Sequence, residues 1–306
     1  MERYLSLTVA AEQDGCTVGH LLKTACRVPG GMIASLKRRK AGICLNGARV
    51  HTNIRVRAGD VLRVRLDVPG ETNPAEPAEI PLVIPYEDAD LAVLEKPAGL
   101  LVHGTPDGKP TLMNALAARW GREQAVYPVH RLDRGTSGLL VVAKNPYAAE
   151  RLRRALHTER FVRDYLALAA GTPPERNGWI DAPVGPMDGE GPRYGLRPDG
   201  RPARTRYEMI CSLRGGCLLR LRLDTGRTHQ IRVHLASIGC PLFGDRLYGG
   251  PELPGLDRPA LHAAHLVLEQ PVTGERLELC SPLPEELRTI LRARGGEEKE
   301  ETTVWR

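Results

Sequence analysis

The sequence predicts an α+β protein in two parts, a small basic α/β unit at the N-terminus and a larger unit built on a mostly antiparallel mixed sheet. Helical and strand-like patterns alternate irregularly along the chain, whereas a parallel doubly wound sheet would alternate them regularly. Hairpin-like segments around residues 201–223 favour antiparallel pairing. Residues 1–70 hold 12 Lys and Arg against 5 Asp and Glu, and the remaining residues hold 31 against 32, so the excess positive charge belongs to the first part.

Length and composition are those of a globular protein. With 306 residues and 42% hydrophobic content, the chain is long enough for about two domains. Its opening residues carry charges and no apolar core of signal-peptide length, and no run reaches the roughly 18 apolar residues that a membrane span needs. The 7 cysteines are odd in number and never spaced as Cys-x-x-Cys, which indicates reduced thiols rather than disulfides or a zinc site. We therefore expect a cytoplasmic protein that does not associate with membranes.

In the first part, apolar residues at positions 32, 33 and 36 predict a helix that ends in a dense basic run. The run consists of Lys37, Arg38, Arg39 and Lys40. Residues 42–50 indicate two strands joined by an Asn46-Gly47 turn, and residues 58–64 indicate another. A basic helix end is favoured by the helix dipole alone, but basic clusters on small domains also bind phosphate backbones. The order of elements resembles the S4 RNA-binding domain, which implies that the basic run contacts RNA.

Composition also marks the boundaries between the parts. Residues 69–79 are rich in Pro, acidic and small residues and lack apolar periodicity, which predicts a semi-rigid extended linker. Beyond a helix that starts near Pro284, the Gly- and Glu-rich end predicts disorder. The predicted divisions are residues 1–68 for the S4-like domain, 69–79 for the linker, 80–294 for the main domain and 295–306 for a disordered tail.

Two helices of the main domain have recognisable ends. Asn145-Pro146 supplies an N-cap followed by proline at the first helical position. Further along, Thr228 is expected to cap a helix that Gly239 terminates. Arg232 then lies near the first turn of that helix, off its apolar stripe.

The most informative stretch is residues 130–138, His-Arg-Leu-Asp-Arg-Gly-Thr-Ser-Gly, which runs into the apolar strand pattern of residues 139–143. It places Asp133 among two arginines and a histidine, and nearby positive charge keeps a carboxylate ionised. Such an acid can serve as a nucleophile or base, but a structural ion pair in an arginine-rich loop explains the same residues. The resemblance to one family decides between them here, because the nonapeptide is similar to the His-Arg-Leu-Asp-x-x-Thr-Ser-Gly signature of the RluA-type pseudouridine synthases.

Further blocks carry the same resemblance in the family's order over roughly residues 80–285. They are the strand and Lys96-Pro97 turn of residues 88–103, the tyrosine block of residues 163–167, and residues 225–234 with their continuation at residues 244–248. The resemblance implies that residues 80–294 form a pseudouridine synthase domain with a curved mixed sheet whose cleft holds the active site.

The resemblance also implies the chemistry, which isomerises uridine without redox change and therefore needs no cofactor. Asp133 would be the nucleophile, attacking either C1′ of the ribose or C6 of uracil. Arg232 would hold Asp133 with a bidentate fork, and Tyr165 would pack against the uracil and relay a proton. The histidines offer no metal set, because His229 with His234 and His262 with His265 lack a completing ligand.

The expected partner is RNA, with ribosomal RNA favoured over transfer RNA, and the protein is expected to act as a monomer. Its uridine must be flipped out of the stack, and groups around the nucleophile must hold the displaced strand. The candidates are His130, Arg131, Arg134 and Arg227. A noncatalytic RNA-binding factor that keeps the synthase fold is the alternative, and the presence of all three catalytic side chains argues against it.

Overall fold

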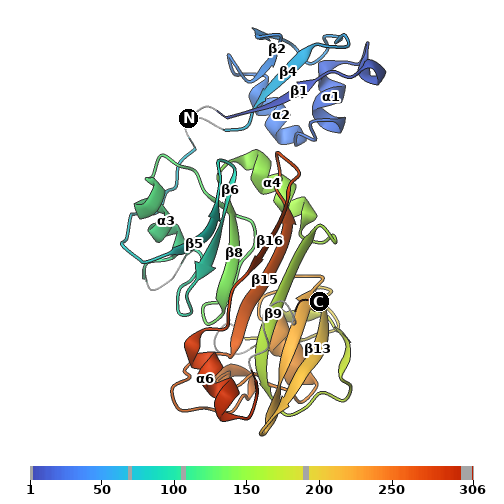
Figure 1. Cartoon of the computed structure of the whole chain (residues 1–306). Coiled ribbons are helices and arrows are strands. Elements are labelled where there is room, and N and C mark those ends of the chain that lie inside the picture. Colours follow the sequence, from blue (N-terminus) through green and yellow to red (C-terminus); the bar gives the residue numbers. More distant parts are fainter. Residues whose placement is uncertain (1–2, 68–70, 105–107, 189–192, 298–304, 306) are drawn as a thin grey trace.

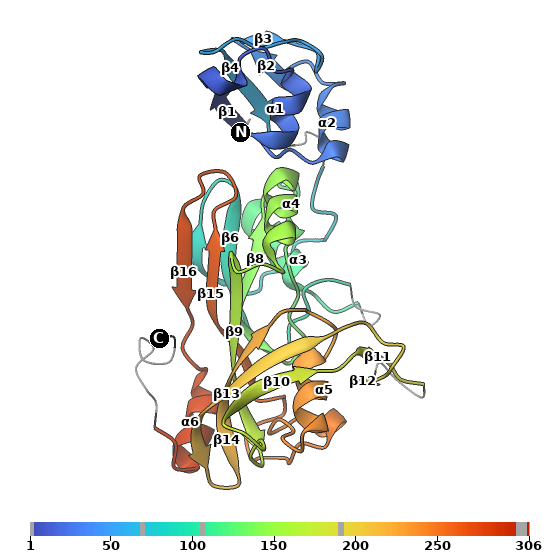
Figure 2. The same ribbon diagram turned by 90° about the vertical axis from the view of Figure 1, so that its right-hand side faces the viewer.

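The computed structural model describes residues 3–67, 71–104, 108–188, 193–297 and 305. They form a small N-terminal unit at one end of a longer body (Figures 1 and 2). Within the described residues, no helix is both long and apolar enough to cross a bilayer.

The N-terminal unit is a four-stranded antiparallel sheet with two α-helices. Its strands lie in the order β1-β4-β2-β3. Their bounds are Tyr4–Thr8 for β1, Ile43–Leu45 for β2, Ala48–Arg49 for β3 and Val61–Arg65 for β4. Helices α1 (Val18–Thr24) and α2 (Gly30–Leu36) pack their apolar side chains against the sheet, and a short 3₁₀ helix, η1 (Ala11–Gln13), precedes them.

The hairpin predicted between residues 42 and 50 is present. Asn46 and Gly47 both adopt positive φ, at 50° and 83°, as a tight two-residue turn requires. The basic run follows α2, with Lys37, Arg38 and Lys40 exposed. Strand β1 was not predicted from the sequence, because it is an edge strand of five residues that are only partly buried or exposed.

Hydrogen bonds and apolar packing hold the N-terminal unit against the main body. Arg3 donates hydrogen bonds of 3.0 and 2.7 Å to the carboxylate of Asp90, which is fully buried and also accepts from Asn145 and Gln270. The Tyr147 hydroxyl donates to the carbonyl of Cys26, and its ring joins the apolar core of the N-terminal unit. These contacts give the two units a defined orientation.

Residues 71–79 contain no helix or strand, and residues 68–70 lie outside the described chain. The segment lies against the main body through Asn73, which is buried and whose side chain donates to the carbonyl of Met113. The backbone N–H of Asn73 donates to the carbonyl of Arg122.

The main body is built on a ten-stranded sheet, counted over the described residues. Its main path runs β10 (Asn177–Asp181), β13 (Arg204–Leu213), β14 (Gly216–Leu223), β9 (Phe161–Ala170), β15 (Leu261–Glu269), β8 (Ser137–Ala143), β6 (Leu91–Lys96) and β5 (Val83–Glu87). In addition, β16 (Arg276–Cys280) pairs with β15, and β7 (Tyr127–Pro128) pairs with β8. Every pairing is antiparallel except β15 with β8, which confirms the predicted α+β class.

Helices cover this sheet on both faces. They are α3 (Leu112–Trp120), α4 (Pro146–Ala155), α5 (Gln230–Ser237) and α6 (Glu285–Ala293), and a 3₁₀ helix, η2, spans Arg246–Tyr248. A separate hairpin pairs β11 (Val184–Pro186) with β12 (Tyr194–Leu196). Helices α3 and α5 share a hydrophobic cluster with Tyr165 of β9, so both lie on the same side of the sheet as that ring.

The predicted helix ends are partly correct. The Asn145 side chain accepts a hydrogen bond from the Ala148 backbone at 2.8 Å and caps α4. Gly239 follows α5 with a φ of 75°, as predicted. The prediction that Thr228 caps α5 was wrong, because the residue before the helix is His229, in a left-handed conformation and without a side-chain cap.

Candidate active site

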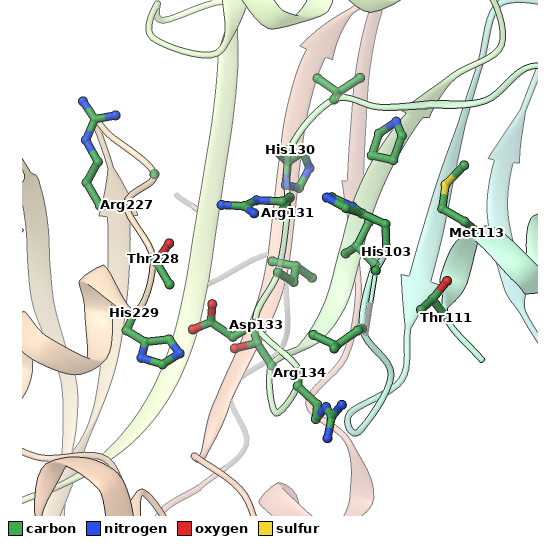
Figure 3. Close-up of a pocket in the computed structure, with 18 of the residues that line it drawn as sticks. His103, Thr111, Met113, His130, Arg131, Asp133, Arg134, Arg227, Thr228 and His229 are labelled. Carbon is green, nitrogen blue, oxygen red and sulfur yellow. The ribbon is translucent and has the colours of Figure 1, made fainter. Parts of the chain in front are cut away.

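A cleft of about 1290 Å³ opens between α3 and α5, above strand β9. Its walls come from the start of α3, from the loop of residues 128–136, from β9 and from residues 223–231. Figure 3 shows Asp133 inside it, with Thr228 and His229 on one side and His103, Thr111 and Met113 on the other. The sequence-predicted loop therefore lies at the centre of a large concave site.

Backbone hydrogen bonds fix the loop that carries Asp133. The Thr136 N–H donates to the Asp133 carbonyl, and the Arg134 carbonyl accepts from the N–H of Gly99 at 2.7 Å. The Asp133 side chain is 28% exposed, so it can meet a ligand that enters the cleft.

Lys96 supports the same loop from inside the protein. It is 1% exposed, and Nζ donates to the carbonyls of Pro97 and Leu100 at 2.8 Å and of Arg134 at 3.3 Å. Burial lowers the pKa of Lys96 to about 7, while the negative charge of Asp133 opposes that shift. No role for Lys96 was predicted from the sequence, although a lysine at the end of an apolar strand was the available signal.

Arg232 approaches Asp133 but has a tighter partner. Its Nη1 lies 4.0 Å from Asp133, at the outer limit of an ion pair. Its Nε and Nη2 each donate to the buried carboxylate of Asp245 at 2.7 Å. The guanidinium also stacks over the ring of Tyr248, 4.8 Å from the ring centre. Arg232 therefore makes its bidentate hydrogen bonds with Asp245 and not, as had been predicted, with Asp133. Only Nη1 of Arg232 faces Asp133.

His229 lines the cleft, and Tyr248 contacts its ring from outside the cleft lining. The Tyr248 hydroxyl accepts from the backbone N–H of Tyr194 and lies 2.8 Å from Nδ1 of His229. Burial lowers the pKa of His229, so the ring is neutral at pH 7 and can accept the Tyr248 proton at Nδ1. The roles of Asp245 and Tyr248 in holding Arg232 were not predicted from the sequence, because both depend on the loop after α5.

Tyr165 lies on β9 and lines the cleft, with 4% of its surface exposed. Burial raises its pKa, so the hydroxyl is protonated at neutral pH. The structure thus brings Asp133, Tyr165 and Arg232 to one region.

The predicted RNA contacts differ in placement. Arg131 and Arg134 are exposed at the cleft, and Arg227 is half-buried there, with Nε donating to the carbonyl of Pro202. His130 is buried, and its Nε2 accepts from the Val141 backbone. Burial, with the nearby Arg163 charge, lowers the pKa of His130 to about 3. His130 lines the cleft, so its predicted contact with the phosphate or base of RNA stays a prediction.

The basic run of residues 37–40 lies on the N-terminal unit and does not line the cleft. Among the described residues, no three His, Cys, Asp or Glu side chains gather closely enough to hold a metal ion.

Comparison with known proteins decides the family. A family model described as RNA pseudouridylate synthase matches residues 90–237. The ribosomal large subunit pseudouridine synthase D of Yersinia pestis is 38% identical over 278 residues, which cover 84% of each chain. The chain belongs to the RluA-type RNA pseudouridine synthases. The predicted family and enzyme class are thereby confirmed.

Solved structures agree with this fold. The synthase matches human RNA Pseudouridylate Synthase Domain Containing 4 with 25% identity and a TM-score of 0.59, over 71% of this chain and 94% of that one. It matches human RNA Pseudouridylate Synthase Domain Containing 1 with 28% identity and a TM-score of 0.55, over 74% and 100%. Both alignments leave part of the synthase unmatched.

Proposed function

We propose that this synthase isomerises uridines of ribosomal RNA to pseudouridine, with Asp133 as the nucleophile. The observation that carries the proposal is the position of Asp133 in the cleft, with the Arg232 charge 4.0 Å away and Tyr165 of β9 lining the same cleft. The relative from Yersinia pestis, named for the large ribosomal subunit, supports the choice of ribosomal RNA. Ribosomal RNA as substrate would place the protein in the cytoplasm, and we propose that it acts there as a monomer.

The reaction exchanges one carbon–nitrogen bond for a carbon–carbon bond and moves a proton from carbon to nitrogen overall. The N1–C1′ bond of uridine breaks, the base turns, and a C5–C1′ bond forms, after which the C5 hydrogen leaves as a proton and N1 takes one up. By the C1′ route, an Asp133 oxygen would bond to C1′ as the N1–C1′ bond breaks, and that ester bond would break as C5 attacks C1′. By the C6 route, Asp133 would add to C6 before the N1–C1′ bond breaks, and it would leave C6 as the C5 proton is lost. No external group enters the product.

The other side chains of the cleft would have distinct roles in this reaction. Arg232 would orient Asp133 through Nη1, the nitrogen that faces it, because an arginine keeps its positive charge. The buried Tyr165 would offer a flat face to the detached uracil and a hydroxyl for proton transfer. Arg131, Arg134 and Arg227 would hold the strand from which the nucleotide has been flipped.

Loss of the C5 hydrogen provides the test. Ribosomal RNA labelled with tritium at C5 of uracil should release tritium when the synthase acts. Asp133→Asn keeps the shape but removes nucleophilicity, so release should stop while RNA affinity stays nearly unchanged. Asp199→Asn, which alters an exposed carboxylate outside the cleft, is the matched control. Retention of more than a few per cent of turnover by Asp133→Asn would exclude the nucleophile role, and no release by the wild type would favour a noncatalytic RNA-binding factor.

We also propose that residues 3–67 are an S4-like RNA-docking domain. The supporting observations are the compact sheet with its own core and the exposed side chains of Lys37, Arg38 and Lys40. Deleting the unit would expose Tyr147 and deprive buried Asp90 of Arg3, so charge neutralisation is the cleaner test.

Changing Lys37, Arg38 and Lys40 together to serine should weaken RNA binding and flatten its salt dependence. Removal of each phosphate contact should reduce the slope of log K against log salt by about 0.7 to 0.9. Turnover at saturating RNA should survive. An unchanged slope would show that the basic run is a solvated surface.

A further inference from the structure

Arg163 occupies an unusual position on the floor of the cleft. It lies on β9 two residues before Tyr165, so both side chains point to the same face of the strand, about 7 Å apart along it. Only 7% of Arg163 is exposed, and it lines the cleft. Its Nε and Nη2 are enclosed by protein and have no hydrogen-bond partner among the described residues.

The other buried arginines show what Arg163 lacks. In the part of the chain that the structure describes, three arginines are buried: Arg163, Arg232 and Arg258. Arg232 binds Asp245 through two 2.7 Å hydrogen bonds, and Arg258 binds Glu286 at 2.6 Å. A buried cation without a counter-charge is costly, so such groups are normally paired. Of the three, Arg163 is the arginine for which the described residues provide no carboxylate partner.

The adjacent acid cannot neutralise Arg163. Asp164 is next in sequence, but successive side chains of a strand point to opposite faces. On the other face, Asp164 accepts two hydrogen bonds from Arg222, at 2.6 and 2.7 Å, and lies 3.2 Å from His265. The Asp164 carboxylate is therefore neutralised by Arg222 on the opposite face of the sheet from Arg163.

A second unpartnered donor lies nearby. His130 accepts from the Val141 N–H through Nε2, so Nδ1 carries the proton, and this atom is also enclosed without a partner among the described residues. The positive charge of Arg163 contributes to the lowered pKa of His130, which places the two groups within electrostatic range. The floor of the cleft thus holds a buried positive charge without a carboxylate partner among the described residues.

The guanidinium faces the space that substrate would enter. A β-carbon placed on Gly226 would lie 3.5 Å from Nη1 of Arg163. Because glycine has no side chain, nothing from that residue separates Nη1 from the cleft.

We propose that Arg163 is a phosphate-binding residue, and that a phosphodiester next to the flipped uridine supplies its missing counter-charge. This inference rests on the proposed RNA substrate. A neutral uracil carbonyl could accept one hydrogen bond but would leave the buried charge uncompensated, whereas a phosphate matches both the charge and the fork of an arginine. On binding, the guanidinium turns the edge formed by Nε and Nη2 toward the phosphate.

The first test compares free-protein stability with RNA binding. Arg163→Met removes the charge and keeps the length of the side chain, so the free protein should be as stable as the wild type or more stable. RNA affinity should fall about 10- to 100-fold, as expected when one charge-assisted hydrogen bond is removed. The salt slope should fall by about 0.7 to 0.9. Arg276→Met, which removes an exposed arginine of β16 outside the cleft, is the control and should change neither the RNA affinity nor the salt slope.

The second test identifies the phosphate. A ribosomal RNA fragment that the wild type modifies is prepared with a neutral methylphosphonate in place of the phosphate on the 5′ or the 3′ side of the target uridine. At one of the two positions, the methylphosphonate should weaken RNA binding by the wild type but change RNA binding by Arg163→Met only slightly. The reason is that the effects of altering two groups in contact are not additive. Arg163→Lys, which keeps the charge without the fork, should retain the penalty.

Two outcomes would overturn the proposal: penalties that are equal in wild type and Arg163→Met at both positions, or Arg163→Met that loses stability while keeping wild-type affinity and slope. If Arg163→Met does not fold, absence of a methylphosphonate penalty in both the wild type and Arg163→Lys overturns it equally. Wild-type tritium release on the unmodified fragment is measured alongside, so failure of the proposed function is recognised separately.

Discussion

Replacing Asp245 with asparagine should lower both the stability and the turnover of the synthase, while RNA affinity changes little. The carboxylate holds Arg232 through two 2.7 Å hydrogen bonds, and Arg232 in turn is the cation that faces Asp133. Asparagine is nearly the same size, so the change removes charge rather than volume.

The size of the effect follows from burial. The Arg232 and Asp245 side chains are 10% and 1% exposed, so water cannot take the place of the carboxylate. Breaking such a buried pair costs about 3 to 5 kcal/mol. Asparagine keeps one acceptor oxygen but turns an NH₂ toward the guanidinium, so we expect the free energy of unfolding to fall by about 3 kcal/mol, at the low end of that range.

Turnover should fall for a different reason. Once the fork is loosened, Arg232 no longer holds its Nη1 at a fixed position beside Asp133, and misplacement of a catalytic group by about 1 Å costs roughly 100-fold in rate. Urea denaturation and single-turnover tritium release measure the two effects separately. Glu252→Gln is the control, since it breaks an exposed pair with Arg246 in the same segment and should cost less than about 1 kcal/mol.

Wild-type turnover in a folded but destabilised Asp245→Asn protein would refute the reasoning, because the position of Arg232 would then not depend on Asp245. Equal losses in turnover and in RNA affinity would instead identify Arg232 as a phosphate contact.

Three further predictions concern the same body. Arg232→Lys keeps the charge but loses the fork, so single-turnover rates should fall far more than RNA affinity measured by filter binding. Burial lowers the pKa of His130 to about 3 and that of His262 to about 4, so below pH 6.5 the unfolded chain binds protons that the folded chain does not. The free energy of unfolding should therefore drop as pH falls from 6.5 to 4, by up to about 1.4 kcal/mol per pH unit for each histidine, and His262→Gln should flatten the urea-denaturation profile. Gly138→Ala should destabilise by about 3 kcal/mol or more, because φ is 109° and the new β-carbon would lie 2.2 Å from a carbonyl of β15. Gly274→Ala, with a φ of 77° and open space around it, should cost much less in the same denaturation assay, and similar losses at both glycines would rule out the clash as the cause.

Local chemistry explains why part of the fold could be predicted from the sequence. The Asn46-Gly47 turn and the Asn145 cap depend on residues within three positions of one another, and both are present. Thr228 has the right chemistry for a cap, yet the left-handed His229 intervenes, because its ring is held by Tyr248. Local propensity there yields to a tertiary contact.

The candidate site divides in the same way. The motif around Asp133 is contiguous, so its residues could be found together. The pairing of Arg232 with Asp245 spans 13 residues and a loop, and nothing in the sequence indicates which acid the arginine binds. The unpaired state of Arg163 is still less visible, because a sequence shows which charges exist but not which remain without a partner.

Asp90 also has a consequence for the order in which the chain can complete its structure. Its carboxylate binds Arg3, Asn145 and Gln270, which come from the beginning, middle and end of the chain. During synthesis the N-terminal unit can fold on its own core long before Gln270 has been made. At about 5 to 20 residues per second, the roughly 200 residues in between take about 10 to 40 s to translate. The hydrogen bonds that Asp90 makes with the first part of the chain therefore come within reach well before the last one, from Gln270, can form.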